Sequence, residues 1–147
     1  MEIAILGLGC FWGPEIKFSK LDGVIKTGVG YCGGNSSETT YKEVCTGTTN
    51  HAEVVKLDFD PKIISYEEIL KYFFKIHDPT TLNSQGPDFG TQYRSEIFYF
   101  NNQQKEISEK IIKEENIKFS GKIVTKVSLV KNYCPAEEYH QKYLEKR

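Results

Sequence analysis

The first nine residues constrain the fold most, because they are apolar at both odd and even positions. Ile3 and Ile5 would lie on one side of an extended segment, whereas Ala4 and Leu6 would lie on the other. A strand that is apolar on both sides has to be covered on both sides, as in the centre of a sheet. Residues 1–9 therefore predict a central strand, and the rest of the chain must supply its neighbours and its covering layers.

The remaining apolar pattern alternates between the periods of helices and strands. We expect helices over residues 14–21, 66–77, 102–116 and 137–146, and further strands over 24–31, 52–60, 95–100 and 123–130. The helix at 66–77 is the clearest, because Ser65 and Glu68 form a capping box before its apolar stripe. This order predicts an α+β fold, a two-layer sandwich with a ferredoxin-like core and a mixed sheet. Residues 1–147 are expected to form a single catalytic domain.

Composition excludes several classes of protein. The chain is 39% apolar and 27% charged with a net charge of −1, which is typical of a soluble globule. No run of 18 apolar residues is present, so we expect no membrane span. Only Arg94 and Arg147 among the 19 basic residues are arginines, which argues against nucleic acid as a ligand. The chain begins without a recognisable secretion signal, so we expect a cytoplasmic protein with reduced thiols.

The strongest chemical signal is Cys10, which follows the first strand and stands where a helix begins. Free N–H groups and the helix dipole at that point favour a thiolate, which is the nucleophilic form of cysteine. Phe11 and Trp12 follow directly, and glycines lie on both sides of the segment. A buried cysteine that packs as a small apolar side chain is the alternative interpretation. The four cysteines, at positions 10, 32, 45 and 134, form no CxxC or CxxH pair, so we expect no metal site.

The second signal is Glu53, which the two-residue period of its strand places on the same side as Val55 and Leu57. A carboxyl on an apolar face is desolvated, so its pKa rises and it can donate a proton near neutral pH. The alternative is a glutamate that escapes to solvent at the start of the strand. His77 lies on the apolar stripe of its helix and is expected to be a core residue. His51 and His140 show no metal-binding spacing.

Six short blocks of residues resemble the peptide methionine sulfoxide reductase A family, and they occur in the order found in that family. They are GCFWG at 9–13, GYCGG at 30–34, YKEV at 41–44, HAEV at 51–54, GPD with GTQYRS at 86–95, and AEEYHQ at 136–141. The resemblance covers nearly the whole chain. It implies reduction of methionine S-sulfoxide, free or in oxidised proteins, without a metal or an organic cofactor.

The resemblance also assigns roles to residues. It implies that Cys10 attacks the sulfoxide sulfur and becomes a sulfenic acid, and that Glu53 protonates the oxygen. Five further residues are implied to bind the substrate: Phe11 and Trp12 around its methyl group, Tyr41 and Tyr93 at the oxygen, and Asp88 as a supporting polar group. Alternation and position point to Cys10 and Glu53 independently. They do not distinguish Tyr41 or Tyr93 among nine tyrosines.

The recycling step differs from the pattern of the family. Many members carry resolving cysteines in a glycine-rich tail beyond the last helix, and we expect no such tail after Arg147. Cys134 is the candidate resolving thiol, at a position where the family usually has an aromatic residue, with Cys32 and Cys45 as alternatives. Thioredoxin, glutaredoxin or a small thiol is the implied reductant, and we expect a monomer. A cycle without any internal resolving cysteine also remains open.

Two other functions compete with the reductase. A cysteine hydrolase or acyltransferase would pair Cys10 with an essential histidine. A non-catalytic module would bind methionine-like side chains through Phe11 and Trp12. Product formation from methionine sulfoxide would distinguish the reductase from both alternatives.

Overall fold

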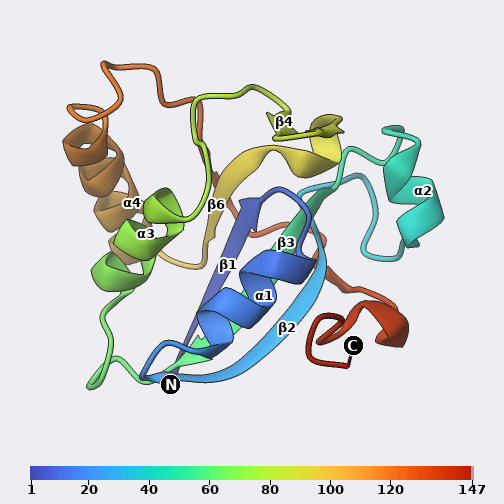
Figure 1. Cartoon of the computed structure of the whole chain (residues 1–147), viewed down its shortest axis with the longest axis horizontal. Helices are drawn as coiled ribbons and strands as arrows, with labels where there is room; N and C mark the ends of the chain where they lie inside the picture. Colours follow the sequence, from blue (N-terminus) through green and yellow to red (C-terminus); the bar gives the residue numbers. More distant parts are fainter. Residues whose placement is uncertain (147) are drawn as a thin grey trace.

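Strand β1 (Glu2–Leu8) lies inside a six-stranded sheet whose order is β7-β6-β1-β3-β2-β8 (Figure 1). The computed structural model describes residues 1–146. The other strands are β2 (Val24–Cys32), β3 (Ala52–Phe59), β6 (Ser95–Tyr99), β7 (Lys126–Leu129) and β8 (Cys134–Pro135), and a separate hairpin joins β4 (Ser84–Gln85) to β5 (Asp88–Phe89). The helices are α1 (Trp12–Ser19), α2 (Tyr41–Cys45), α3 (Tyr66–Lys75) and α4 (Asn102–Glu115), with 3₁₀ turns at Thr91–Tyr93 and Glu138–His140.

The sheet is mixed, as expected. Strand β1 pairs antiparallel with β3 and β6, and β2 pairs antiparallel with β3 and β8, whereas β6 and β7 are parallel. The central order β6-β1-β3-β2 is built from a β-α-β-β-α-β succession in which β3 lies between β1 and β2. This is the split arrangement of a ferredoxin-like core. The predicted fold class, an α+β two-layer sandwich with a mixed sheet, is confirmed.

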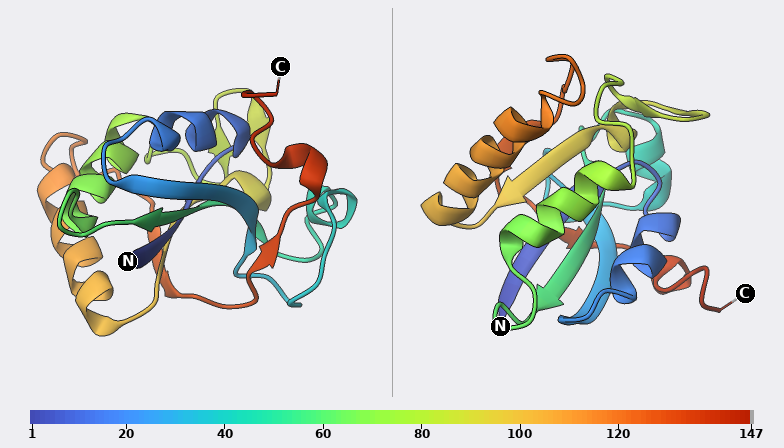
Figure 2. Two further views of the ribbon diagram at one scale, coloured as in Figure 1. Left: turned by 90° about the horizontal axis from the view of Figure 1, so that it is seen from below. Right: turned by 60° about the vertical axis from the view of Figure 1, so that its left-hand side comes forward.

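Helices α1 and α3 cover one face of the sheet, and α4 lies beside α3 (Figure 2). On β3 this face carries Val55, Leu57 and Phe59, which belong to the main apolar cluster. The opposite face is smaller and includes Ala52 and Val54. It is crossed by the residues that connect β7 at one edge to β8 at the other. The prediction of a first strand buried on both faces is therefore confirmed.

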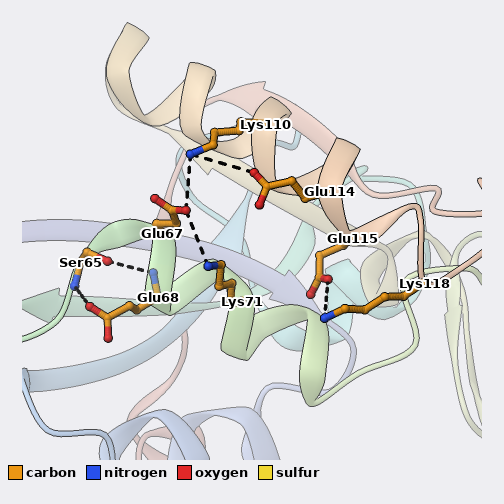
Figure 3. Close-up of polar contacts among 8 residues, drawn as sticks. All are labelled: Ser65, Glu67, Glu68, Lys71, Lys110, Glu114, Glu115 and Lys118. Carbon is orange, nitrogen blue, oxygen red and sulfur yellow. Dashed lines mark hydrogen bonds and ion pairs between the residues drawn. The ribbon is translucent and has the colours of Figure 1, made fainter.

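Helix α3 begins where the capping box predicts. The Ser65 hydroxyl accepts a hydrogen bond from the Glu68 backbone, and the Glu68 carboxylate accepts one from the Ser65 backbone (Figure 3). Glu67 forms ion pairs with Lys71 on the same helix and with Lys110 on α4. These charges are largely exposed and contribute little. The apolar side chains of the two helices therefore hold α3 and α4 together.

The predicted helix at 137–146 is wrong. The segment forms only the 3₁₀ turn Glu138–His140, followed by non-helical turns. Three of its polar side chains, those of Glu137, His140 and Gln141, bond to distant parts of the chain instead of facing solvent. Short elements α2, β4, β5 and β8 were not expected from the sequence. None of the helices within residues 1–146 is long and apolar enough to cross a lipid bilayer.

Candidate active site

Cys10 lies between the end of β1 and the start of α1, as the sequence predicts, and is partly exposed. The turn that presents it requires a glycine at position 9. Gly9 has a φ of 100°, and a Cβ there would lie 2.7 Å from Cγ of Gln85. The backbone N–H of Trp12 donates a hydrogen bond to the Cys10 sulfur. Strand, turn and helix thus hold the thiol beside the β4–β5 hairpin.

The expectation of a thiolate at Cys10 is wrong for the free protein. Burial raises the pKa of this thiol to about 11, and the nearby charges of Glu53 and Asp88 raise it further. The Trp12 N–H lowers the pKa but does not compensate for the burial. Desolvation of the charged form therefore outweighs the helix start. Cys10 is a neutral thiol at pH 7 until another group changes its surroundings.

Glu53 lies on the helix-covered face of β3 and is 1% exposed, so the prediction from alternation is confirmed. Its Oε1 atom accepts a hydrogen bond of 3.3 Å from the Phe11 backbone, whereas Oε2 is buried with no hydrogen-bond partner among residues 1–146. Burial raises the pKa of Glu53 to about 8, and the charge of Asp88 adds to this effect. The carboxyl is therefore mostly protonated at pH 7, with one oxygen still unused.

Two phenols stand near this carboxyl. Tyr41 begins α2 and Tyr93 ends the 3₁₀ turn Thr91–Tyr93, and the two phenols lie close enough to influence each other's pKa. Burial raises the pKa of Tyr93 to about 12 and raises the pKa of Tyr41 above its usual value, and the charge of Glu53 acts in the same direction on both. Both side chains are therefore neutral hydrogen-bond donors at pH 7. The Cys45 thiol lies close enough to the Tyr41 hydroxyl to raise its pKa as well.

The two aromatic residues that follow Cys10 lie in different surroundings. Phe11 is 1% exposed and packs in the main apolar cluster, with its ring centroid 5.8 Å from that of Tyr31. Trp12 is half-buried, and its indole ring stacks on Tyr143 with the centroids 3.8 Å apart. Phe11 thus lies behind the surface around Cys10, whereas Trp12 forms part of it.

All three histidines are at least partly buried. His77 has both ring nitrogens in hydrogen bonds, to the Phe73 carbonyl and the Ser95 hydroxyl, so the prediction of a core histidine is confirmed. Burial lowers the pKa of His77 to about 4. His51 and His140 are 1% and 2% exposed. The charges that act on Cys10 come from Glu53 and Asp88 rather than from a histidine.

Arg94 is a structural residue of the site that sequence reasoning missed. Its guanidinium pairs with Glu96 at 2.5 Å and is 9% exposed. It also donates hydrogen bonds to the backbone oxygens of Asn50 and Thr91. These bonds join the segment before Glu53 to the turn that carries Tyr93. Only its place in the GTQYRS block could have marked Arg94 as important.

The arrangement can combine attack by a thiol with proton donation from a neutral carboxyl. Tyr41 and Tyr93 add neutral donors that can bind an oxygen atom. Within residues 1–146, no three His, Cys, Asp or Glu side chains are grouped so that they could hold a metal ion. This set of groups is suited to an enzyme that acts through a cysteine and a carboxylic acid.

Comparison with known proteins identifies the family. The family model of peptide methionine sulfoxide reductase matches residues 2–147. A peptide methionine sulfoxide reductase MsrA from Pelagibacter ubique is 80% identical over 147 residues, which is 100% of both chains. One from Methanothermobacter thermautotrophicus is 52% identical over 99% of this chain and 87% of its own.

Solved structures agree. The reduced form of Mxr1 from Saccharomyces cerevisiae superposes with a TM-score of 0.95 at 43% identity, over 99% of this chain and 85% of that one. Mxr1 in complex with Trx2 gives a TM-score of 0.70 at 28% identity, over 97% of this chain and 84% of that one. The chain belongs to the peptide methionine sulfoxide reductase family. It is an oxidoreductase that returns methionine sulfoxide to methionine.

Proposed function

We propose that Cys10 is the nucleophile and Glu53 the acid in reduction of the S epimer of methionine sulfoxide. The buried Oε2 atom of Glu53, which has no hydrogen-bond partner within residues 1–146 and belongs to a carboxyl whose pKa is raised to about 8, is the observation that carries this proposal. Such a group holds a proton at neutral pH and finds no acceptor for it in the described part of the chain. A sulfoxide oxygen becomes a good leaving group only when it is protonated, so it fits this donor.

The proposed step balances without an external reagent. The Cys10 sulfur attacks the sulfoxide sulfur and forms an S–S bond. The protonated oxygen then passes from the substrate sulfur to the Cys10 sulfur as the S–O and S–S bonds break, so that methionine leaves and Cys10 becomes a sulfenic acid. Two electrons pass from the cysteine sulfur to the substrate sulfur. Glu53 gives its proton to the oxygen, and the proton of the Cys10 thiol returns the carboxyl to its neutral form. A charged Glu53 raises the pKa of Cys10, so a protonated Glu53 also favours ionisation of the thiol.

The other site residues would bind the substrate. The hydroxyls of Tyr41 and Tyr93 would donate to the sulfoxide oxygen, and Trp12 would contact the methyl group. Phe11 would support that surface from below, since its side chain is buried. Asp88 would act as a polar group at the rim, where its charge reaches both Cys10 and Glu53.

One assay tests the proposed function. Reduced protein is mixed with an excess of methionine S-sulfoxide in the absence of reductant, and methionine and the state of Cys10 are measured by mass spectrometry. We expect one methionine per chain and oxidation at Cys10, followed by turnover when dithiothreitol is added. Ester cleavage that depends on a histidine would indicate a hydrolase instead, and binding without product would indicate a non-catalytic module.

For recycling we propose a thiol cycle with thioredoxin as the protein reductant, and glutaredoxin or a small thiol as alternatives. The solved complex of yeast Mxr1 with Trx2 supports thioredoxin. We keep Cys134 as a candidate resolving residue. Its thiol donates to the Thr39 carbonyl at 3.7 Å, and its strand pairs with Tyr31. Cys45 is a second candidate, because it is exposed and its thiol lies near the Tyr41 hydroxyl.

Thiol counting separates these routes. A chain with a resolving cysteine should lose two thiols after one turnover, and the serine variant of that cysteine should lose only one. Cys134→Ser and Cys45→Ser serve as controls for each other. Loss of a single thiol in the wild type, with a dimedone-reactive Cys10, would show that neither cysteine resolves the sulfenic acid.

We further propose that residues 1–147 act as one monomeric catalytic domain in the cytoplasm on oxidised proteins and free methionine sulfoxide.

A further inference from the structure

The AEEYHQ block at residues 136–141 has no role in the proposed chemistry, although its polar side chains make several long-range contacts. We call residues 136–143 the strap. It follows β8 and runs beside α1 and β2 at the C-terminal end of the chain (Figure 1). Because it is not helical, its side chains rather than its own backbone determine where it lies.

The strap is fixed to β2 and α1 through hydrogen bonds to buried groups. The Gln141 amide accepts from the Val29 N–H and donates to the Val29 carbonyl, both at 2.9 Å, so it pairs with the edge of β2 as a neighbouring strand would. The backbone N–H of Lys142 donates to Glu15 of α1 at 2.7 Å. Glu15 is itself 2% exposed. The two residues directly after His140 are therefore attached to β2 and α1.

His140 directly precedes these attachments, and only 2% of its surface is exposed. Its Nδ1 atom accepts a hydrogen bond of 3.0 Å from Nε1 of Trp12. An acceptor at Nδ1 requires the proton of the neutral ring to be on Nε2, which is buried without a partner among residues 1–146. Burial lowers the pKa of His140, which agrees with a neutral ring. The ring thus presents a fixed acceptor to the tryptophan.

Trp12 is held on two sides by the strap. His140 binds the indole N–H, and the Tyr143 ring stacks on the indole at a centroid distance of 3.8 Å and an interplanar angle of 12°. Trp12 is the first residue of α1, and the N-cap residue Phe11 makes no side-chain capping bond. The start of this helix therefore takes part of its orientation from the strap rather than from a local cap.

The strap also reaches the other side of the site. The Glu137 carboxylate accepts hydrogen bonds from the backbone N–H of Tyr41 at 2.9 Å and from the Tyr31 hydroxyl at 2.8 Å. The His140 ring lies 4.6 Å from the Tyr41 ring, between centroids. One segment therefore contacts both Trp12 and Tyr41, which come from parts of the chain that are distant in sequence.

We propose that His140 is a positioning residue, which sets the indole of Trp12 beside Cys10 and thereby determines how the enzyme accepts the apolar body of its substrate. This inference rests on the proposed role of Trp12 in substrate binding. It assigns to His140 no contact with the reacting atoms. Loss of the acceptor at Nδ1 would leave the indole N–H without its partner and release the ring, at a cost of about tenfold in kcat/KM.

Three substitutions separate positioning from simple packing. His140→Asn keeps an amide oxygen near the position of Nδ1, His140→Gln places its amide near Nε2, and His140→Leu removes the acceptor but retains apolar bulk. Trp12 is the only tryptophan of the chain, so its fluorescence reports on the site without labelling. The kinetic readout is the ratio of kcat/KM for methionine sulfoxide to that for dimethyl sulfoxide, which lacks the larger apolar body.

We expect His140→Leu and His140→Gln to lower this ratio about tenfold, mainly through KM, and to make Trp12 more accessible to acrylamide quenching. His140→Asn should instead keep the ratio and the acrylamide quenching of the wild type. His77→Asn is the matched control, since His77 is a bonded histidine away from Trp12. It should lower the melting temperature without changing the ratio or the fluorescence.

A folded His140→Leu variant with unchanged ratio and quenching would overturn the positioning role. The variant Trp12→Ala tells this failure apart from failure of the proposed function. If Trp12→Ala lowers the ratio while His140→Leu does not, the indole binds substrate but does not depend on His140. If neither variant changes the ratio, Trp12 does not contact the substrate.

Discussion

The backbone N–H of Phe11 donates a hydrogen bond of 3.3 Å to Oε1 of Glu53, and Oε2 of the same carboxyl has no partner among the described residues 1–146. This bond ties the turn after Cys10 to strand β3, so it sets the carboxyl beside the thiol. A single backbone donor does not stabilise the charged form enough to offset burial, and the pKa of Glu53 stays near 8. The contact thus positions the acid, whereas burial keeps it protonated.

Cys10→Ser should abolish reduction of methionine sulfoxide. The hydroxyl of serine does not form an alkoxide near neutral pH, so the nucleophile is lost while the volume is nearly kept. Methionine release per chain measures the effect, with Cys45→Ser as a control for loss of an exposed thiol. More than trace turnover in Cys10→Ser would remove Cys10 from its proposed role.

Glu53→Gln should keep the fold and slow the chemical step by about 10²–10⁴, the usual contribution of a positioned acid. Its amide oxygen can still accept the Phe11 N–H, so the site geometry is retained. Single-turnover methionine formation at pH 7 isolates the step from recycling. If the rate of the variant equals that of the wild type, the carboxyl has a structural role only.

The same substitution should stabilise the protein at high pH. The pKa of Glu53 is raised from 4.5 to about 8 in the folded state, so folding is disfavoured as the unfolded carboxyl ionises between these values. This penalty is absent below about pH 4 and complete above about pH 8. The stability of Glu53→Gln relative to the wild type should therefore rise by roughly 2–4 kcal/mol between pH 5 and pH 9. Urea titrations at both pH values measure it, and a difference that does not change with pH would contradict the assigned pKa.

Truncation of Phe11 and of Trp12 should give different results. Phe11 is fully packed, so Phe11→Ala should cost about 3–5 kcal/mol of stability. Trp12→Ala should instead lower kcat/KM for methionine sulfoxide more than kcat/KM for dimethyl sulfoxide. The indole surface that is lost contacts the larger apolar body of methionine sulfoxide. Thermal melts are recorded beside the kinetics. Equal losses on both substrates would point to a folding defect in Trp12→Ala.

Local patterns predicted the parts of the structure that local forces determine. The capping box at Ser65 gave the start of α3, and the two-residue period of β3 gave the buried side of Glu53. Both depend only on neighbours in sequence. The turn at Gly9 is also local in part, because its φ of 100° favours glycine whatever its distant neighbours are.

The predictions that failed concern features that depend on residues distant in sequence. The strap has a helix-like composition, but the Gln141 amide pairs with Val29 and takes the segment out of a helix. Tyr41 owes its position to a bond between its backbone and Glu137, which is 96 residues away. No spacing in the sequence could therefore select Tyr41 among nine tyrosines. The sequence predicts a lowered pKa for Cys10 for the same reason. The burial that raises this pKa arises only in the assembled fold.

The protonation state of Glu53 is the central claim, and its titration can be observed directly. Protein labelled with carbon-13 at the glutamate carboxyls is followed by NMR from pH 5 to pH 10, and the Glu53 signal is assigned by its absence in Glu53→Gln. We expect this signal to keep the shift of a protonated carboxyl through pH 7 and to titrate with a midpoint near pH 8. A midpoint at or below about pH 5, as in a solvent-exposed glutamate, would contradict the account.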